Sequence, residues 1–189
     1  MTTTDDKELI ARIQAGDTAA YRETMKRYGT PIFTLIRRIV GSREDAEELT
    51  QDVFLKAFDR IGRYRGESSF STWLYRIAYN CAVSKYRKRK REMPFADETA
   101  QERIPDTNAP WQGEDASGKR EALLSALETA LSRLPTEEAM IVSLFYTARK
   151  SVEELADITG YSASNIKVKL HRIRRKLGTL IENIQTTEL

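Results

Sequence analysis

The stretch SVEELADITGYSASNIKVKLHRIRRKL, residues 151–177, decides the fold of the second half of the chain. Ser151 and Glu154 have the spacing of a capping box, in which each side chain bonds the backbone N–H of the other at the start of a helix. Gly160 then permits a tight turn, because glycine adopts positive φ at little cost. The helix expected after this turn has an apolar face made of Ile166, Leu170, Ile173 and Leu177. Helix, glycine turn and second helix form a helix-turn-helix.

Basic and polar side chains, with no acidic residue among them, cover the other faces of the second helix. They are Asn165, Lys167, Lys169, His171, Arg172, Arg174, Arg175 and Lys176. This pattern indicates a recognition helix for the major groove of DNA, although a basic helix can also be merely solvated. We expect the residues near its start to reach base edges, and the later ones to meet phosphates: Arg174, Arg175 and Lys176.

Two further helices, over 120–133 and 136–147, are predicted before this pair, so residues 119–189 should form a four-helix domain. Residues 1–91 should form another helical domain. Its predicted helices span 5–15, 18–28, 31–40, 43–60 and 71–91. No long alternating strand pattern interrupts either region. We therefore expect an all-α protein of two small helical domains joined by a flexible linker.

The linker is predicted over residues 92–118, where the apolar periodicity of the flanking regions disappears. Three of the five prolines lie there. The segment carries seven acidic residues against one arginine, a net charge of −6, whereas residues 1–91 carry +7 and residues 119–189 carry +2. Such an acidic tether can lie over a basic surface, or it can be a spacer without a partner.

Composition excludes several classes of protein. The one cysteine, Cys81, leaves neither a disulfide framework nor a cysteine-rich zinc site. No nucleotide-binding glycine loop or nucleophile–base arrangement is visible, so we expect no catalytic residue, no cofactor and no metal. The polar start MTTTDDKELI is unlike a signal peptide, and no apolar run approaches the roughly 20 residues of a membrane span. We expect a cytoplasmic protein without membrane insertion.

The helix predicted over 71–91 carries a second stripe beside its core face. The stripe recurs at helical spacing and consists of Trp73, Arg76, Asn80, Val83 and Arg87. Aromatic rings stack on unpaired bases, and basic side chains follow the phosphates. The helix ends in KYRKRKR, where six of seven residues are basic. A basic run alone is usually a solvated tail, but beside this stripe it favours a surface for single-stranded nucleic acid.

Three stretches resemble the extracytoplasmic-function sigma factors of the sigma-70 family. DAEELTQDVFLKAF, residues 45–58, is similar to the helix with which that family binds core RNA polymerase. RYRGESSFSTWLYRIAYN, residues 63–80, is similar to its −10 and strand-opening element. LPTEEAMIVSLFYTARKSVEELADITGYSASNIKVKLHRIRRKL, residues 134–177, is similar to its −35 reading domain. The resemblance implies a polymerase specificity subunit whose partners are core RNA polymerase, promoter DNA and an anti-sigma factor.

The resemblance also implies roles for individual residues. The polymerase-binding side chains would be Asp45, Glu48, Gln51, Asp52 and Leu55. Those that hold the melted −10 strand would be Tyr64, Arg65, Ser68, Ser69, Trp73, Arg76, Asn80 and Arg87. Among them, Trp73 would wedge the duplex open and Asn80 would help to hold a flipped base. Those at the −35 element would be Arg149, Asn165, Lys167, Val168, His171, Arg172 and Arg175.

The chain departs from the family's common pattern in two places. Arg149 and Lys150 stand where many relatives have a glycine-containing turn. Val168 and His171 differ from the common choices in the recognition helix, so the −35 sequence cannot be transferred from a relative. Without a catalytic arrangement, DNA opening must be driven by binding, which has to offset an unstacking cost of a few kcal/mol.

Two alternatives remain from the sequence. A regulator that uses only its helix-turn-helix would leave the Trp73 stripe and the acidic face of residues 43–60 without a role. A helical scaffold would leave the basic segments as solubilising surface.

The spacing of the two promoter elements bears on the linker. In the family they lie about one and a half turns apart, roughly 50 Å at about 34 Å per turn. A linker of 27 residues reaches at most ~90 Å but averages ~30 Å as a coil. The polymerase, not the linker, is therefore expected to set the spacing. Free protein should bind such a promoter weakly, and a compact form would let its domains mask each other's DNA surfaces.

Overall fold

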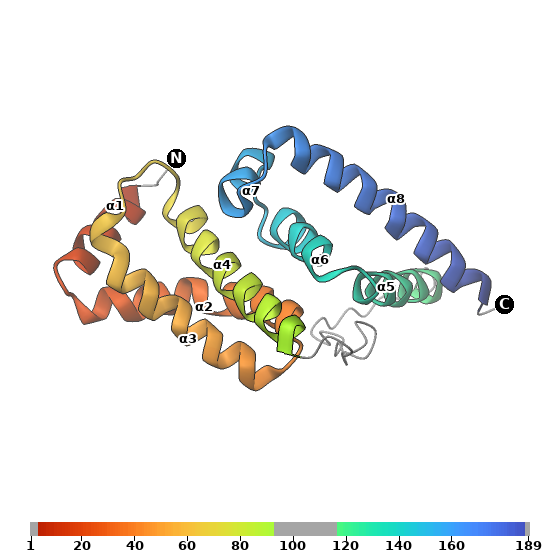
Figure 1. The fold of residues 1–189 in the computed structure, drawn as a ribbon, viewed down its shortest axis with the longest axis horizontal. Helices are drawn as coiled ribbons and strands as arrows, with labels where there is room; N and C mark the ends of the chain where they lie inside the picture. Colours follow the sequence, from red (N-terminus) through yellow and green to blue (C-terminus); the bar gives the residue numbers. More distant parts are fainter. Residues whose placement is uncertain (1–3, 93–116, 188–189) are drawn as a thin grey trace.

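The computed structural model of the chain describes residues 4–92 and 117–187, and every regular element in these ranges is a helix (Figure 1). The first range holds α1 (Thr4–Gln14), α2 (Thr18–Val40), α3 (Arg43–Arg60), a 3₁₀ turn (Ile61–Arg63) and α4 (Phe70–Glu92). The second holds α5 (Ser117–Ser132), α6 (Thr136–Val142), a π-helical turn (Ser143–Thr147), α7 (Val152–Thr159) and α8 (Ala163–Thr187). The predicted all-α class and the four-helix second domain are confirmed. The linker predicted over 92–118 lies almost entirely outside the described residues.

Helix α2 differs from the prediction of two helices at 18–28 and 31–40. It is one helix of 23 residues that continues through Pro31. Proline lacks the N–H that bonds the preceding turn, which costs a helix interior about 3 kcal/mol. Four large side chains that follow it are buried in the core: Ile32, Leu35, Ile36 and Ile39. Each stabilises the fold by roughly 1.5–3 kcal/mol, so their packing outweighs the local break at Pro31.

Helices α7 and α8 form the predicted helix-turn-helix. Ser151 Oγ accepts a hydrogen bond from the Glu154 N–H, and Glu154 Oε2 accepts one from the Ser151 N–H, so the capping box is present. Gly160 ends α7 with a φ of 79°, in the left-handed region that glycine tolerates. Helix α8 extends to Thr187, beyond the apolar stripe predicted to end at Leu177. Helix α5 packs against this extension, where Ala126 and Ala130 meet Ile184.

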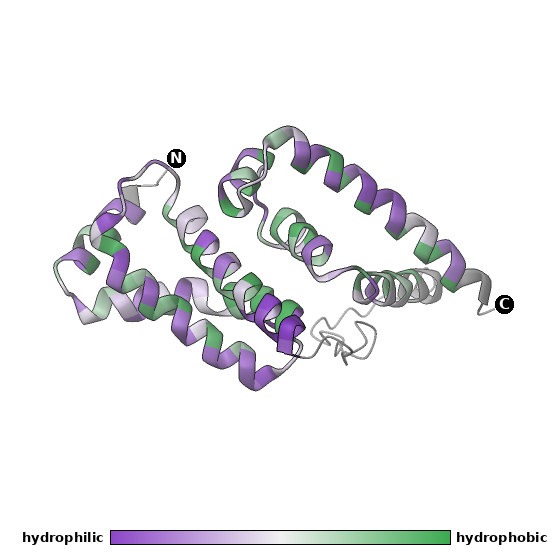
Figure 2. Cartoon of the chain, in the orientation of Figure 1, coloured by the Kyte–Doolittle hydropathy of each residue, from purple (hydrophilic) through white to green (hydrophobic). Residues whose placement is uncertain are grey.

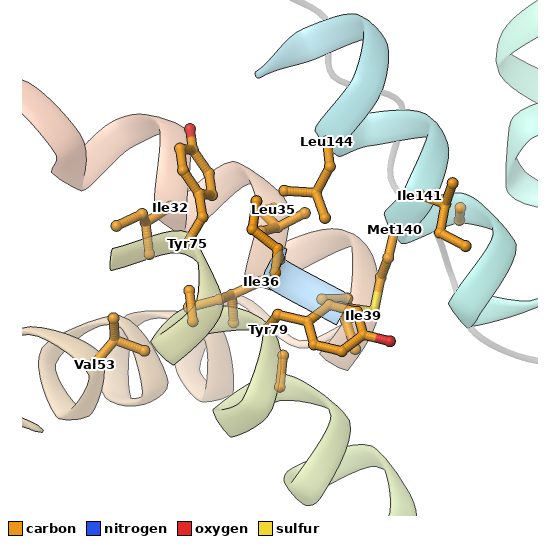
Figure 3. Close-up of a cluster of buried hydrophobic side chains, with 14 of the residues drawn as sticks. Ile32, Leu35, Ile36, Ile39, Val53, Tyr75, Tyr79, Met140, Ile141 and Leu144 are labelled. Carbon is orange, nitrogen blue, oxygen red and sulfur yellow. The ribbon is translucent and has the colours of Figure 1, made fainter. Parts of the chain in front are cut away.

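The two domains share one apolar core. Side chains of α2, α3 and α4 belong to the same buried cluster as side chains of α6, α7 and α8. Figure 3 shows Leu144 next to Leu35, and Met140 next to Ile39 and Tyr79. Helix α7 lies on α4, and α6 lies against α2. The chain therefore has the compact form considered from the sequence, held by apolar contacts between domains that the sequence did not predict.

Candidate nucleic-acid and polymerase interfaces

The residues predicted to bind polymerase lie on the outer side of α3, opposite its buried side. The buried side consists of Ala46, Leu49, Val53, Phe54 and Ala57. On the outer side Asp45 is half-buried, Glu48, Gln51 and Asp52 are exposed, and Leu55 exposes 67% of its surface. An apolar side chain surrounded by polar ones resembles the core and rim of protein interfaces.

Lys85 of α4 reaches the acidic side chains nearest the start of α3. Its Nζ lies 3.1 Å from Asp45 Oδ1 and 3.7 Å from Glu48 Oε2. These carboxylates raise the pKa of Lys85, first through its hydrogen bond to Asp45. The side chain of Asp52, by contrast, bonds no other residue in the described part of the chain. Asp52 is therefore a free carboxylate on this face.

An aromatic cluster supports the loop predicted to open DNA. The rings of Trp73 and Phe70 stack at 5.9 Å between centroids, and Tyr64 lies 5.4 Å from Trp73. Tyr28 of α2 meets Phe70 edge-on at 5.8 Å. The Tyr64 hydroxyl donates to the carbonyl oxygen of Ser68 at 2.6 Å. Phe70 is fully buried, whereas Trp73 is half-buried, so Trp73 is an outer member of a packed cluster.

Two residue groups support this loop in a way that the sequence did not predict: Phe70, and the helix predicted over 5–15, which is α1. The i, i+3 spacing of Phe70 and Trp73 is the signal that identifies the first of them. Helix α1 packs Ile13 into a second buried cluster with Ile61 and Phe70. The side-chain amide of Gln14 donates to the carbonyl oxygen of Ile61 at 3.2 Å. Helix α1 thus fixes the point where the loop leaves α3.

Part of the predicted −10 surface is open. Arg65 in the loop and Arg76 and Asn80 on α4 are exposed, and within the described ranges their side chains bond no other residue. An amide one helical turn from a guanidinium offers both hydrogen bonds and charge to a nucleotide. Figure 2 shows the C-terminal end of α4 as strongly hydrophilic, where the basic run 85–91 lies.

The second domain covers another part of that surface. Ser69 Oγ lies 2.7 Å from Thr72 Oγ1 and 3.5 Å from Glu154 Oε1 of α7. Arg87 remains exposed, although it lines the edge of a small cavity between α4 and α6 together with Glu137. The residues predicted to hold a melted strand are therefore divided between an open part and a covered part.

The residues predicted to contact −35 DNA are all exposed. They are Arg149, Asn165, Lys167, Val168, His171, Arg172 and Arg175. No side chain of this set bonds another residue among those the structure describes. Free cationic and amide side chains on one helix are suited to base edges and phosphates.

A second row of basic residues on α8 is tied to the rest of the domain. Lys169 and Lys176 form ion pairs with glutamates of α6, at 3.3 Å and 3.0 Å. Arg174 Nε donates to the hydroxyl of Tyr146 at 2.7 Å. Of the three residues expected to meet phosphates, only Arg175 thus lacks a partner within the described domain. Arg174 and Lys176 instead bond side chains of their own domain, Tyr146 and Glu138.

Burial and bonding change the pKa of groups between the domains. Burial alone would raise the pKa of Glu154, but hydrogen bonds from the Thr72 hydroxyl, a backbone N–H and Lys150 outweigh it and lower that pKa to about 2. Burial raises the pKa of Tyr75 to about 12. At neutral pH this contact therefore holds a charged carboxylate and a neutral phenol.

The groups gathered on these surfaces are aromatic rings, amides, carboxylates and cationic side chains, whose chemistry is stacking, hydrogen bonding and charge. Across residues 4–92 and 117–187 no three histidine, cysteine, aspartate or glutamate side chains gather as they would around a metal ion. No helix in these ranges combines the length and apolarity needed to cross a membrane.

Comparison with known proteins identifies families for both halves of the chain. Residues 24–92 match the family model of sigma-70 region 2, and residues 124–177 match that of sigma-70 region 4. The first match covers most of α2 and all of α3 and α4, and the second covers the helix-turn-helix. Helix α1 lies before the first match.

The relatives are matched over nearly their whole length. The RNA polymerase sigma-H factor of Pseudomonas aeruginosa is 26% identical over 190 residues, covering 96% of this chain and 96% of that protein. The ECF RNA polymerase sigma factor SigW of Bacillus subtilis is 28% identical over 186 residues, covering 94% and 97%. The sigma factor RpoE of Bartonella quintana, solved with the anti-sigma factor NepR, has a TM-score of 0.67 and 23% identity, covering 86% and 96%. This last likeness is one of fold.

Proposed function

The chain belongs to the extracytoplasmic-function class of the sigma-70 family and directs RNA polymerase to promoters, and from this premise we propose how its surfaces divide the work. Residues 1–91 bind core polymerase and open the −10 element, and residues 119–189 read the −35 element. Residues 92–118 tether the two domains to each other. Sigma factors are non-catalytic specificity subunits. We propose that this chain likewise has no catalytic activity of its own and acts in the cytoplasm.

Core polymerase binds the outer face of α3 in this proposal. Exposed Leu55 supplies an apolar centre, and Gln51 and Asp52 supply free polar groups around it. The ion pairs of Lys85 with Asp45 and Glu48 are partly exposed. Pairs of that kind contribute only about 0–1 kcal/mol, so a basic group of the polymerase can replace Lys85.

Trp73 and the loop before α4 open the duplex. A base stacked on an aromatic side chain gains about 1–3 kcal/mol, which is comparable to the few kcal/mol that unstacking costs. Because Trp73 is already held by Phe70 and Tyr64, little side-chain entropy is lost when a base binds. Asn80 and Arg76 lie further along the same helix and hold the flipped base and its phosphate.

Helix α8 reads the −35 element in the major groove. Lys167 and Arg172, with Asn165 and His171, contact base edges, and Arg175 contacts phosphate. The ion pairs of Lys169 and Lys176 with α6 fix the orientation of the helix. Base contacts from a fixed helix are more selective, because a mismatched base cannot be accommodated by rotating the helix.

We also propose an anti-sigma factor as a partner. The Bartonella quintana protein was solved with such a factor, and this chain shares its fold. A factor that covers the outer face of α3 would compete directly with core polymerase. Binding of the two would then be mutually exclusive.

The observation that carries the proposal is that one chain holds two different surfaces for nucleic acid. One is a packed aromatic cluster with a free amide and guanidinium beside it, and the other is a helix with free cationic side chains. A regulator that uses only its helix-turn-helix has no role for the first surface. A subunit that opens promoters requires both.

Reconstitution with core RNA polymerase tests the proposal. The full-length protein should co-purify with core enzyme, and the complex should start transcripts at genomic sites that share two sequence elements at a fixed spacing. Core enzyme alone, under the same conditions, is the control and should show no such preference. Failure to bind core enzyme, or initiation without sequence preference, would contradict the proposal.

A further inference from the structure

Lys150 is the only lysine or arginine that is buried among the described side chains, with 7% of its surface exposed. It stands in the turn before α7, where the sequence departs from the common pattern of sigma factors. Its Nζ donates to Ser71 Oγ at 2.6 Å and to Glu154 Oε1 at 2.9 Å, and lies 3.3 Å from Thr72 Oγ1. Ser71 and Thr72 belong to the first turn of α4, so hydroxyls of the first domain hold a lysine of the second.

Glu154 completes this contact between the domains. Its Oε1 accepts a hydrogen bond from the hydroxyl of Thr72, while its Oε2 caps α7. The ring of Tyr75 lies 5.4 Å from Lys150 Nζ, a distance typical of a cation–π contact. A buried ammonium is tolerated only when hydrogen-bond partners and a counter-charge surround it. The two hydroxyls and the aromatic ring come from α4 and are present only while α7 lies on α4.

The backbone that directs Lys150 inward is unusual. Arg149 has a φ of 51°, and within the described ranges it is the only residue other than glycine with a positive φ. The Lys150 N–H donates to the carbonyl oxygen of Leu144 at 3.0 Å, which closes the turn. Glycine would adopt this conformation more easily than a residue with a side chain. Arg149 thus remains exposed for DNA while the next residue enters the interface.

While α7 lies on α4, the distance between the two proposed DNA surfaces is too short for them to reach both promoter elements. Thr72, bonded to Glu154 at the start of α7, is the neighbour of Trp73. Helix α7 has eight residues and therefore spans about 12 Å, after which the turn at Gly160 leads to the start of α8. The two DNA surfaces thus lie much closer together than the roughly 50 Å between the promoter elements. Helix α7 must leave α4 before both elements can be read.

We propose that Lys150 and Glu154 form a latch that holds the second domain on the first turn of α4 in the free protein, and that core polymerase opens this latch when it separates the domains. The inference rests on the proposed roles of the strand-opening loop and of α8. While the latch is closed, Ser69 and Thr72 at the start of the strand-opening helix are bonded to the second domain. Ser69, which belongs to the proposed −10 surface, cannot then contact DNA.

Charge reversal is the appropriate test. An apolar replacement of Lys150 could leave the interface intact, because buried ion pairs are often replaced by hydrophobic residues without loss. Lys150→Glu instead places two carboxylates together and should open the latch. Combining it with Glu154→Lys restores opposite charges at i, i+4 and should close it again. Ser71→Ala, which removes only one hydroxyl from the first domain, should act in the same direction more weakly.

Arg43→Glu is the matched control, because it reverses the same charge in an i, i+4 ion pair inside the first domain, on a helix that carries neither label. All variants are made in full-length protein carrying Cys81→Ser, with labels on cysteines introduced at the exposed positions Ser84 and Ser164. Two quantities are measured on the free protein. The first is the label-to-label distance by double electron–electron resonance, and the second is the affinity for a single-stranded −10 oligonucleotide. Circular dichroism checks that each variant is folded.

Lys150→Glu should lengthen the distance and raise oligonucleotide affinity about tenfold, because a closed population reduces apparent affinity in proportion. The charge-swapped double variant should return toward wild type, and Arg43→Glu should leave the distance unchanged. An unchanged distance in folded Lys150→Glu would overturn the latch. A longer distance without a gain in affinity would overturn the masking of DNA contacts. Neither outcome bears on transcription with core polymerase, which tests the proposed function separately.

Discussion

The two surfaces that we propose for DNA are built in opposite ways. In the first domain, Trp73 is one ring of a packed cluster with Phe70 and Tyr64. In the second domain, the side chains of α8 that we propose to face DNA are exposed to solvent, and an adjacent row of basic residues is bonded to α6. The rings of the first surface hold one another in place. The side chains of the second surface are placed only by α8, whose own position is held by its bonds to α6.

This difference follows from what each surface must do. Opening a duplex requires a rigid aromatic face that gains energy only when a base leaves the stack. Reading a duplex requires side chains that can adjust to base edges and exchange counterions at phosphates. The first surface should therefore be sensitive to packing, and the second to salt.

The largest effect is expected from removing the Trp73 ring of the first surface. Trp73→Ala should reduce open-complex formation on duplex promoters about 100-fold, near the upper end of the 1–3 kcal/mol for a stacked base, because the cluster is also disturbed. Permanganate footprinting of the holoenzyme on linear and on pre-melted templates measures this. Trp73→Phe, which keeps an aromatic face, should retain most activity. An equal defect on pre-melted DNA would show that duplex opening is not the main role of Trp73.

The next effect tests the second surface. Arg172→Ala should cost about 1–3 kcal/mol at preferred −35 sites and change which base is preferred. Arg175→Ala should weaken all sites alike and reduce the salt slope by about one. A promoter-library selection at two salt concentrations separates the two behaviours. If both variants keep the wild-type preference, the division into base and phosphate contacts is wrong.

A smaller effect is expected on the outer face of α3, where, as on α8, a free charged side chain should contribute to binding without contributing to folding. Asp52→Arg should weaken core-polymerase binding about fivefold, since rim charges act modestly, without changing the free energy of unfolding. Glu47→Arg is the control, because Glu47 lies about 140° around the helix from Asp52 and, among the described residues, pairs only with Arg43. Competition against a second sigma factor measures the affinity. Equal core affinity for Asp52→Arg and wild type would remove Asp52 from the interface.

The smallest effect concerns the contact between the two domains. The pKa of Glu154, about 2, lies below its ordinary value of 4.5, so its contribution to stability is complete above about pH 4.5 and is lost as the pH falls toward 2. The contribution should be less than about 1 kcal/mol, because the carboxylate is partly exposed and screened. Urea unfolding at pH 5 and pH 3 should therefore show a smaller decrease in stability for Glu154→Gln than for wild type. Equal decreases would contradict the assigned pKa.

Much of the fold could be predicted from the sequence because local signals agreed with packing. The capping box at Ser151 and the glycine at 160 fix the ends of α7, and the apolar periods identify the helices. Pro31 led to a wrong prediction of two helices, because the tendency of proline to end a helix was outweighed by the packing of α2. The interface between domains could not be predicted, because Tyr75 and Tyr79 fit the core pattern of their own helix equally well. Lys150 gave no sign of burial, since its partners lie 79 and 78 residues away in the sequence.

The central claim is that polymerase, rather than this chain alone, brings the two DNA surfaces into use together. Its most direct test is the affinity for a duplex carrying both promoter elements, measured for the free protein and for the holoenzyme while the spacing between the elements is varied. The holoenzyme should bind tightly at one spacing, and the free protein should bind weakly with no preferred spacing. Tight binding by the free protein with the same spacing preference as the holoenzyme would contradict the claim.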